Sequence, residues 1–205
     1  MSTSSGGLPV HGTVRSPALV RWAGFAAAVG GALWAVKGTA ILLTGDQPEY
    51  IFEVAPLLFA IGLAGLHALL ERHGGKSARV GGALALTALA LAASSAAYYL
   101  ATTDDEGFPL SATIPLTALS IFAALVLLGI AVRRADALPG RWRSLPLAIG
   151  AGAVPMLMVG GILEGLSERL LEIPLVVLGL AWIALGYAIW THVPDVPGET
   201  APTRA

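Results

Sequence analysis

Residues 112–132 read ATIPLTALSIFAALVLLGIAV, a stretch without one ionisable side chain, and Arg133 and Arg134 follow it directly. An α-helix needs about 20 apolar residues to cross the hydrocarbon core of a bilayer. Basic residues just beyond such a helix favour the cytoplasmic side of the membrane. This stretch therefore predicts a transmembrane helix that ends at the cytoplasmic surface.

Five other stretches have a similar length and apolar character, and none shows the alternating pattern of a transmembrane barrel strand. The loops between them are short, so consecutive helices are expected to pack as antiparallel neighbours. The sequence thus predicts an all-α fold, a polytopic transmembrane bundle of six helices arranged as three antiparallel hairpins within residues 17–192. The expected spans are 20–43, 51–70, 80–101, 112–132, 145–163 and 171–190.

The composition agrees with lipid as the surrounding solvent. Hydrophobic residues make up 56% of the chain and charged residues 12%, and the mean hydropathy is +0.76. A soluble domain carries about 25% charged residues. The chain has no cysteine, which excludes disulfides and thiolate chemistry. Residues 1–16 and 193–205 are rich in small and polar residues and are predicted to be disordered cytoplasmic tails.

Charge alternates between successive loops, which predicts the orientation of the chain. A cleaved signal peptide is the competing interpretation of the first span, but its apolar run is too long for one. Lys/Arg excess marks cytoplasmic loops, so both termini are expected in the cytoplasm. The Ala-, Gly- and Arg-rich composition favours a bacterial source, and hence the bacterial inner membrane. Ten of the twelve basic residues lie on the predicted inner side: Arg15, Arg21, Arg72, Lys76, Arg79, Arg133, Arg134, Arg141, Arg143 and Arg204.

Small residues recur at helical spacing where helices could approach closely. Close van der Waals contact between small residues holds helices together in lipid. We interpret these residues as intramolecular packing positions, with a homo-oligomer seam as the alternative. Trp34 and Trp182 lie deep in their spans and are also expected between helices. The glycines concerned are Gly24, Gly31 and Gly38, Gly179 and Gly186, and Gly161 with Gly165.

The three predicted hairpins share a weak internal sequence similarity. The Pro-Leu pairs that begin at Pro56, Pro115 and Pro174 are 59 residues apart and open the returning helix of each hairpin. Proline is tolerated in the first turn of a helix. Hairpins sized to one bilayer share such a period without common ancestry, so a true repeat stays an open alternative.

Ionisable groups at membrane depth are functional candidates by default. Lys37 lies about 9 Å before the end of the first span, and its side chain leans into the membrane. A carboxylate partner would relieve its burial, and Glu164 is the preferred partner, with Glu53 second. A polar site around them would also include Tyr98 and Tyr99, with Glu168, Arg169 and Glu172 at its rim. A structural ion pair is the favoured interpretation. A solute- or ion-binding site is the first alternative, and snorkelling of the Lys37 side chain to the surface is the second.

His67 lies one turn before Glu71, which makes the two a possible proton-active pair. One histidine and one glutamate fall short of a metal-site signature, so no metal is predicted. No protease, hydrolase or nucleotide-binding motif occurs, and no catalytic residue or cofactor is predicted. Membrane topology explains the basic residues, so no nucleic-acid partner is expected.

Three functions remain. A non-enzymatic membrane protein (a partner subunit, scaffold or small sensor) ranks first, with the lipid bilayer, a membrane-protein partner or a second copy as its contacts. A small-solute or ion transporter with an outward-facing site at Lys37 and Glu164 is the alternative. A lipid-modifying enzyme ranks last, because only the regions of His67 and Glu164 offer acid–base groups.

Overall fold

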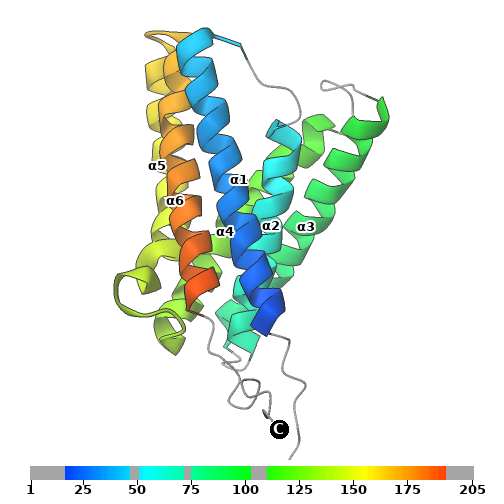
Figure 1. The fold of residues 1–205 in the computed structure, drawn as a ribbon, viewed down its shortest axis with the longest axis vertical. Coiled ribbons are helices and arrows are strands. Elements are labelled where there is room, and N and C mark those ends of the chain that lie inside the picture. The colour runs from blue at the N-terminus through cyan, green and yellow to red at the C-terminus, as the bar shows by residue number, and fades with distance from the viewer. Residues whose placement is uncertain (1–16, 47–50, 72–74, 103–109, 193–205) are drawn as a thin grey trace, which may run out of the picture.

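The computed structural model describes residues 17–46, 51–71, 75–102 and 110–192, and the two predicted tails lie outside these ranges. The described chain is all-helical, without a strand in these ranges (Figure 1). Two short 3₁₀ helices, η2 (Gly140–Ser144) and η3 (Glu168–Leu171), precede the last two α-helices. The six α-helices are α1 (Pro17–Thr44), α2 (Ile51–Leu70), α3 (Lys76–Thr102), α4 (Leu110–Ala135), α5 (Leu145–Glu164) and α6 (Glu172–Thr191).

Each predicted span thus corresponds to one helix, which confirms the fold class. Five of the helices are long and apolar enough to cross a membrane. The sixth, α2, has 20 residues, about 30 Å of helix, and the described apolar part begins at Val54. The three Pro-Leu pairs lie in the first two turns of α2, α4 and α6. Pro174 is in the first turn of α6, whereas Pro56 and Pro115 lie one turn farther inside their helices.

The helices form a ring in which each helix contacts its sequence neighbours and the last helix contacts the first. Figure 1 shows α1 between α6 and α2, with α3 on the far side of α2. The most extensive interface joins α1 to α6, whereas α5 and α6 share the smallest interface between consecutive helices. The third hairpin is therefore held mainly through α1 rather than by its own two helices.

The core contains buried side chains from all six α-helices, with the largest shares from α2 and α4. On α2, Phe59, Leu63, Leu66 and Leu70 follow the spacing of one helix face and are at most 2% exposed. α2 reaches α4 and α6 across the ring in addition to its two neighbours. The burial of one continuous stripe makes α2 the inner helix of the bundle.

The α4–α5 connection turns sharply at the lower end of the bundle. Asp136 has a φ of 53°, and the Ala137 N–H donates to the Val132 carbonyl at 3.2 Å, which closes the end of α4. The Asp136 carboxylate accepts a hydrogen bond from Arg143. This exposed ion pair links η2 to the turn that follows α4.

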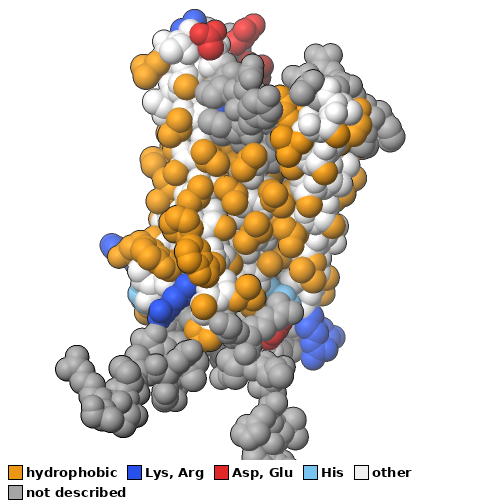
Figure 2. Space-filling view, turned by 45° about the vertical axis from the view of Figure 1, so that its right-hand side comes forward, with side chains coloured by type: hydrophobic (Ala, Val, Ile, Leu, Met, Phe, Trp, Pro, Cys, Tyr) orange, Lys and Arg blue, Asp and Glu red, His pale blue; other side chains and the backbone are white. Residues whose placement is uncertain are grey.

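The outer surface is broadly hydrophobic between two charged ends (Figure 2). Trp22 is 68% exposed, and on α5 Met158 and Ile162 are 67% and 71% exposed. Soluble monomers rarely expose apolar surface on this scale, whereas hydrocarbon solvates it without penalty. The fold and surface therefore define a polytopic helical membrane protein.

Candidate functional site

Lys37 and Glu172 form a buried ion pair near the end of the α1–α6 interface where α6 begins. The Lys37 Nζ lies 4.0 Å from the Glu172 Oε1, and the two residues are 6% and 7% exposed. Glu172 is the first residue of α6, and its Oε2 is buried without a hydrogen-bond partner. The burial predicted for Lys37 is confirmed, but the preferred partner was wrong: the carboxylate is Glu172, which had been assigned to the rim.

Glycine packing brings this pair together. A Cβ on Gly31 would lie 2.5 Å from the Gly179 carbonyl oxygen, and one on Gly24 would lie 2.9 Å from the Gly186 carbonyl oxygen. A Cβ on Gly38 would lie 3.3 Å from the Glu172 Oε2. The backbones of α1 and α6 therefore touch at seven-residue steps on both helices, which confirms the predicted packing of these glycines. The prediction was wrong for Gly161 and Gly165, which are exposed near the end of α5, where an added Cβ would meet no other helix.

The antiparallel register of this seam explains why Glu172 is the partner. Seven residues before Gly179 on α6 is residue 172, just as Gly38 is seven residues after Gly31 on α1. The third glycine of α1 thus faces the carboxylate of α6, and Lys37 stands beside that glycine. The sequence contained a sign of this partner, because the seven-residue step from Gly186 to Gly179 continues to Glu172.

The other members of the expected polar site are not gathered around Lys37. Glu164 is exposed at the end of α5 and forms no ion pair with it. Tyr98 and Tyr99 are half-buried on α3, which packs against α2 and α4 rather than against α1 or α6. The Glu53 side chain lies outside the described residues. Of the rim residues, Glu168 and Arg169 are exposed.

His67 does not pair with Glu71. Its imidazole ring lies directly over Gly82 of α3, and the Nδ1 is buried without a hydrogen-bond partner. Glu71 is exposed in the turn that follows α2. The predicted proton-active pair is therefore wrong. Because Gly82 has no side chain, the His67 ring occupies that space in the α2–α3 interface, away from the Glu71 carboxylate.

Replacing Gly82 with alanine is expected to destabilise the protein by about 1–3 kcal/mol, because the new methyl group would overlap the His67 ring. Removing the ring as well, in Gly82→Ala with His67→Ala, should recover part of that loss. Thermal unfolding in detergent of both single variants and the double variant measures the coupling. Strictly additive effects would contradict the packing described.

An apolar cavity of about 120 Å³, partly open to the surroundings, lies among the helices. Phe59 stacks on Trp182 at a centroid distance of 4.3 Å and meets Trp34 edge-on at 5.4 Å. This aromatic group forms one wall of the cavity. α5 contributes no lining residue, and the full lining is Trp34, Pro56, Phe59, Ala92, Ser95, Ile114, Thr117, Ala118, Ile121, Phe122, Leu178 and Trp182.

The polar groups at this cavity are already engaged or enclosed. Ser95 donates to the Leu91 carbonyl or to the Thr113 hydroxyl, and Thr117 donates to the Thr113 carbonyl. The Trp34 Nε1 is buried with less than 1 Å² exposed and has no hydrogen-bond partner. The position of Trp34 and Trp182 between helices was predicted from the sequence, whereas the cavity that they line was not.

The described residues contain no group of three His, Asp or Glu side chains that could hold a metal ion. Comparison with family models, with curated proteins and with solved structures gives no match for the chain. The fold and the site therefore carry the functional argument alone. In the described residues they define a helical membrane protein with a buried ion pair at a helix junction and an apolar cavity.

Proposed function

We propose that this chain is a non-enzymatic protein of the bacterial cytoplasmic membrane that acts as a scaffold, partner subunit or small sensor. The observation that carries the proposal is the closed environment of the Lys37–Glu172 pair, with both residues less than a tenth exposed. An outward-facing solute site at Lys37 would expose its charge to water, whereas a buried pair between two helices fixes their order and register.

The remaining buried polar side chains support the same proposal. In the described part of the chain these are Ser95 and Thr117, and both hydroxyls bond within α3 and α4. Hydroxyls that satisfy neighbouring backbone carbonyls need no substrate to explain them. These two hydroxyls are thus explained by helix packing.

Ion flux into liposomes tests this proposal against the transporter alternative. The purified chain should pass no protons, K⁺ or Cl⁻ above the rate of protein-free liposomes. The matched comparison is the double variant Lys37→Met with Glu172→Met, which keeps two side chains of similar length but removes both charges. Flux in the wild type that disappears in this variant would overturn the proposal. Native mass spectrometry from membranes would then separate a stoichiometric partner subunit from a lone scaffold.

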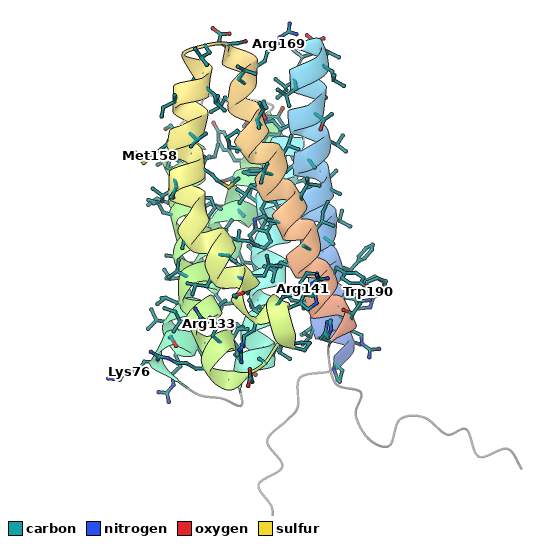
Figure 3. The ribbon with its side chains drawn as sticks, turned by 90° about the vertical axis from the view of Figure 1, so that its left-hand side faces the viewer. Lys76, Arg133, Arg141, Met158, Arg169 and Trp190 are labelled. Atoms are coloured by element: carbon teal, nitrogen blue, oxygen red, sulfur yellow. The ribbon has the colours of Figure 1, made fainter. Side chains whose placement is uncertain are left out.

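The charge distribution supports an orientation with both termini in the cytoplasm. Figure 3 shows Lys76, Arg133 and Arg141 at one end of the bundle and Arg169 at the other. The basic end also carries the exposed Arg134 and Arg143. Lys/Arg excess in short loops marks the cytoplasmic face.

Single cysteines test this orientation, since the native chain has none. We expect Ser167→Cys, in the exposed α5–η3 turn, to react with a membrane-impermeant maleimide in intact cells. Ser144→Cys, exposed at the opposite end in the last residue of η2, should react only after lysis. The reverse labelling pattern would invert the proposed topology.

A further inference from the structure

We propose that the cavity beside Trp34 and Trp182 is a binding site for an uncharged planar ring compound dissolved in the membrane. This inference goes beyond the proposed scaffold role and gives the chain a ligand. It stands on the size, wall chemistry and dryness of the cavity, and it does not depend on the Lys37–Glu172 pair.

The size of the cavity fits a single ring. Its volume of about 120 Å³ is close to that of an engineered apolar cavity of about 150 Å³ that stays dry and binds benzene. Native interiors are packed densely, with few voids larger than a water molecule. A preformed space of this size therefore fits a small ligand better than it fits ordinary packing.

The walls favour a flat, uncharged occupant. Phe59 and Trp182 are stacked with an interplanar angle of 17° and are 2% and 1% exposed, so this wall is rigid. Phe122 of α4 lines the same space. Aromatic rings attract other rings in offset or edge-on geometry. Four helices other than α3 contribute large apolar side chains, which gives the ring contacts from several directions.

Water is a poor occupant of this cavity. A buried water needs two to four polar partners. The Ser95 and Thr117 hydroxyls already bond to groups of α3 and α4, and the Trp34 N–H is enclosed by protein atoms. The occupant must therefore gain its affinity from dispersion and apolar contact. A ring compound dissolved in the membrane can make such contacts.

Tryptophan fluorescence gives a direct readout. Of the five tryptophans, Trp22, Trp142 and Trp190 lie away from the cavity and can be replaced with phenylalanine. The remaining emission then comes from the two cavity tryptophans. In lipid nanodiscs, we expect bromobenzene, a ring that quenches by contact, to produce a saturable loss of emission above the linear quenching by probe dissolved in lipid.

A cavity-filling variant and a matched control locate the bound probe. Ala118→Leu on α4 extends into the cavity, while Ala123→Leu on the same helix is exposed to the outside. The saturable component should weaken at least tenfold in the first and stay unchanged in the second. Ala92→Val on α3 is the second filling variant should Ala118→Leu fail to fold, as judged by thermal unfolding.

Two results would overturn the inference. Quenching that is linear in every variant, or saturable to the same degree in Ala118→Leu and Ala123→Leu, would mean that the cavity binds no ring. Saturable quenching by 1-bromohexane at the same or lower concentration would identify a flexible chain, such as a lipid tail, as the occupant. Selective, saturable quenching by bromobenzene would support the ring site.

Discussion

Replacing Lys37 with methionine should destabilise the folded protein by about 3–5 kcal/mol. The substitution removes the cation that the structure places 4.0 Å from Glu172, and it leaves that carboxylate buried at 7% exposure. An uncompensated buried charge produces losses of this size. The Glu172 Oε2 already has no hydrogen-bond partner, so the fold offers no ready substitute for the ammonium group. Unfolding in mixed detergent, followed by circular dichroism, measures the difference.

The double variant Lys37→Met with Glu172→Met separates loss of charge pairing from loss of packing. Replacement of a whole buried pair by apolar side chains of similar volume is often neutral or stabilising. We therefore expect the double variant to recover most of the stability that the single variant loses. Thr39→Met provides the matched control, because Thr39 is exposed on the same helix two residues away. A Lys37→Met variant as stable as the Thr39→Met control would exclude a structural role for the pair.

The helices can be predicted well from the sequence because the length and apolar character of each span indicate that lipid surrounds it. A run of about 20 apolar residues must cross the bilayer whatever its neighbours do. Residues 51–70 and 145–163 accordingly correspond to α2 and α5 within one residue at each end. The depth of Lys37 along α1 could also be predicted, since it follows from counting residues alone.

The partner of Lys37 could not be predicted in this way because it depends on the arrangement of helices. Glu164 and Glu172 lie only eight residues apart along the chain, at the two ends of the α5–α6 connection. The choice between them depends on which helix packs against α1, and that helix is the last in the sequence. The same limit applies to the cavity, whose lining comes from five helices. His67 shows the limit locally, because Gly82 of the next helix turns its ring away from Glu71.

The α1–α6 seam should be the most sensitive interface to added volume. Gly31→Leu is expected to destabilise the protein by at least about 3 kcal/mol, at the upper end of the range for overpacked cores. Its Cβ would lie 2.5 Å from the Gly179 carbonyl oxygen and 2.7 Å from the Ile183 nitrogen, and both are backbone atoms that no side-chain rotation can move. The two helices would have to separate. Loss of the monodisperse folded peak in detergent chromatography, together with a lowered melting temperature, measures the effect.

Gly161→Leu is the matched control for this substitution. A Cβ on Gly161 meets nothing within 4 Å, so the same side chain on α5 would extend into the surroundings. We expect its stability to stay within about 1 kcal/mol of the wild type, since glycine is the poorer helix former. Equal destabilisation by both leucines would mean that the α1–α6 contact is no tighter than the free face of α5.

The seam and the ion pair should also prove to be one cooperative unit. Lys37 and Glu172 meet only while Gly31 and Gly179 hold α1 and α6 in this register, because the pair lies about one heptad farther along the same interface. Once Gly31→Leu has separated the helices, removing Lys37 should have little further effect. Gly31→Leu with Lys37→Met should therefore lose clearly less stability than the sum of the single variants, as expected of coupled sites. Additive losses would show that the ion pair forms independently of the glycine seam.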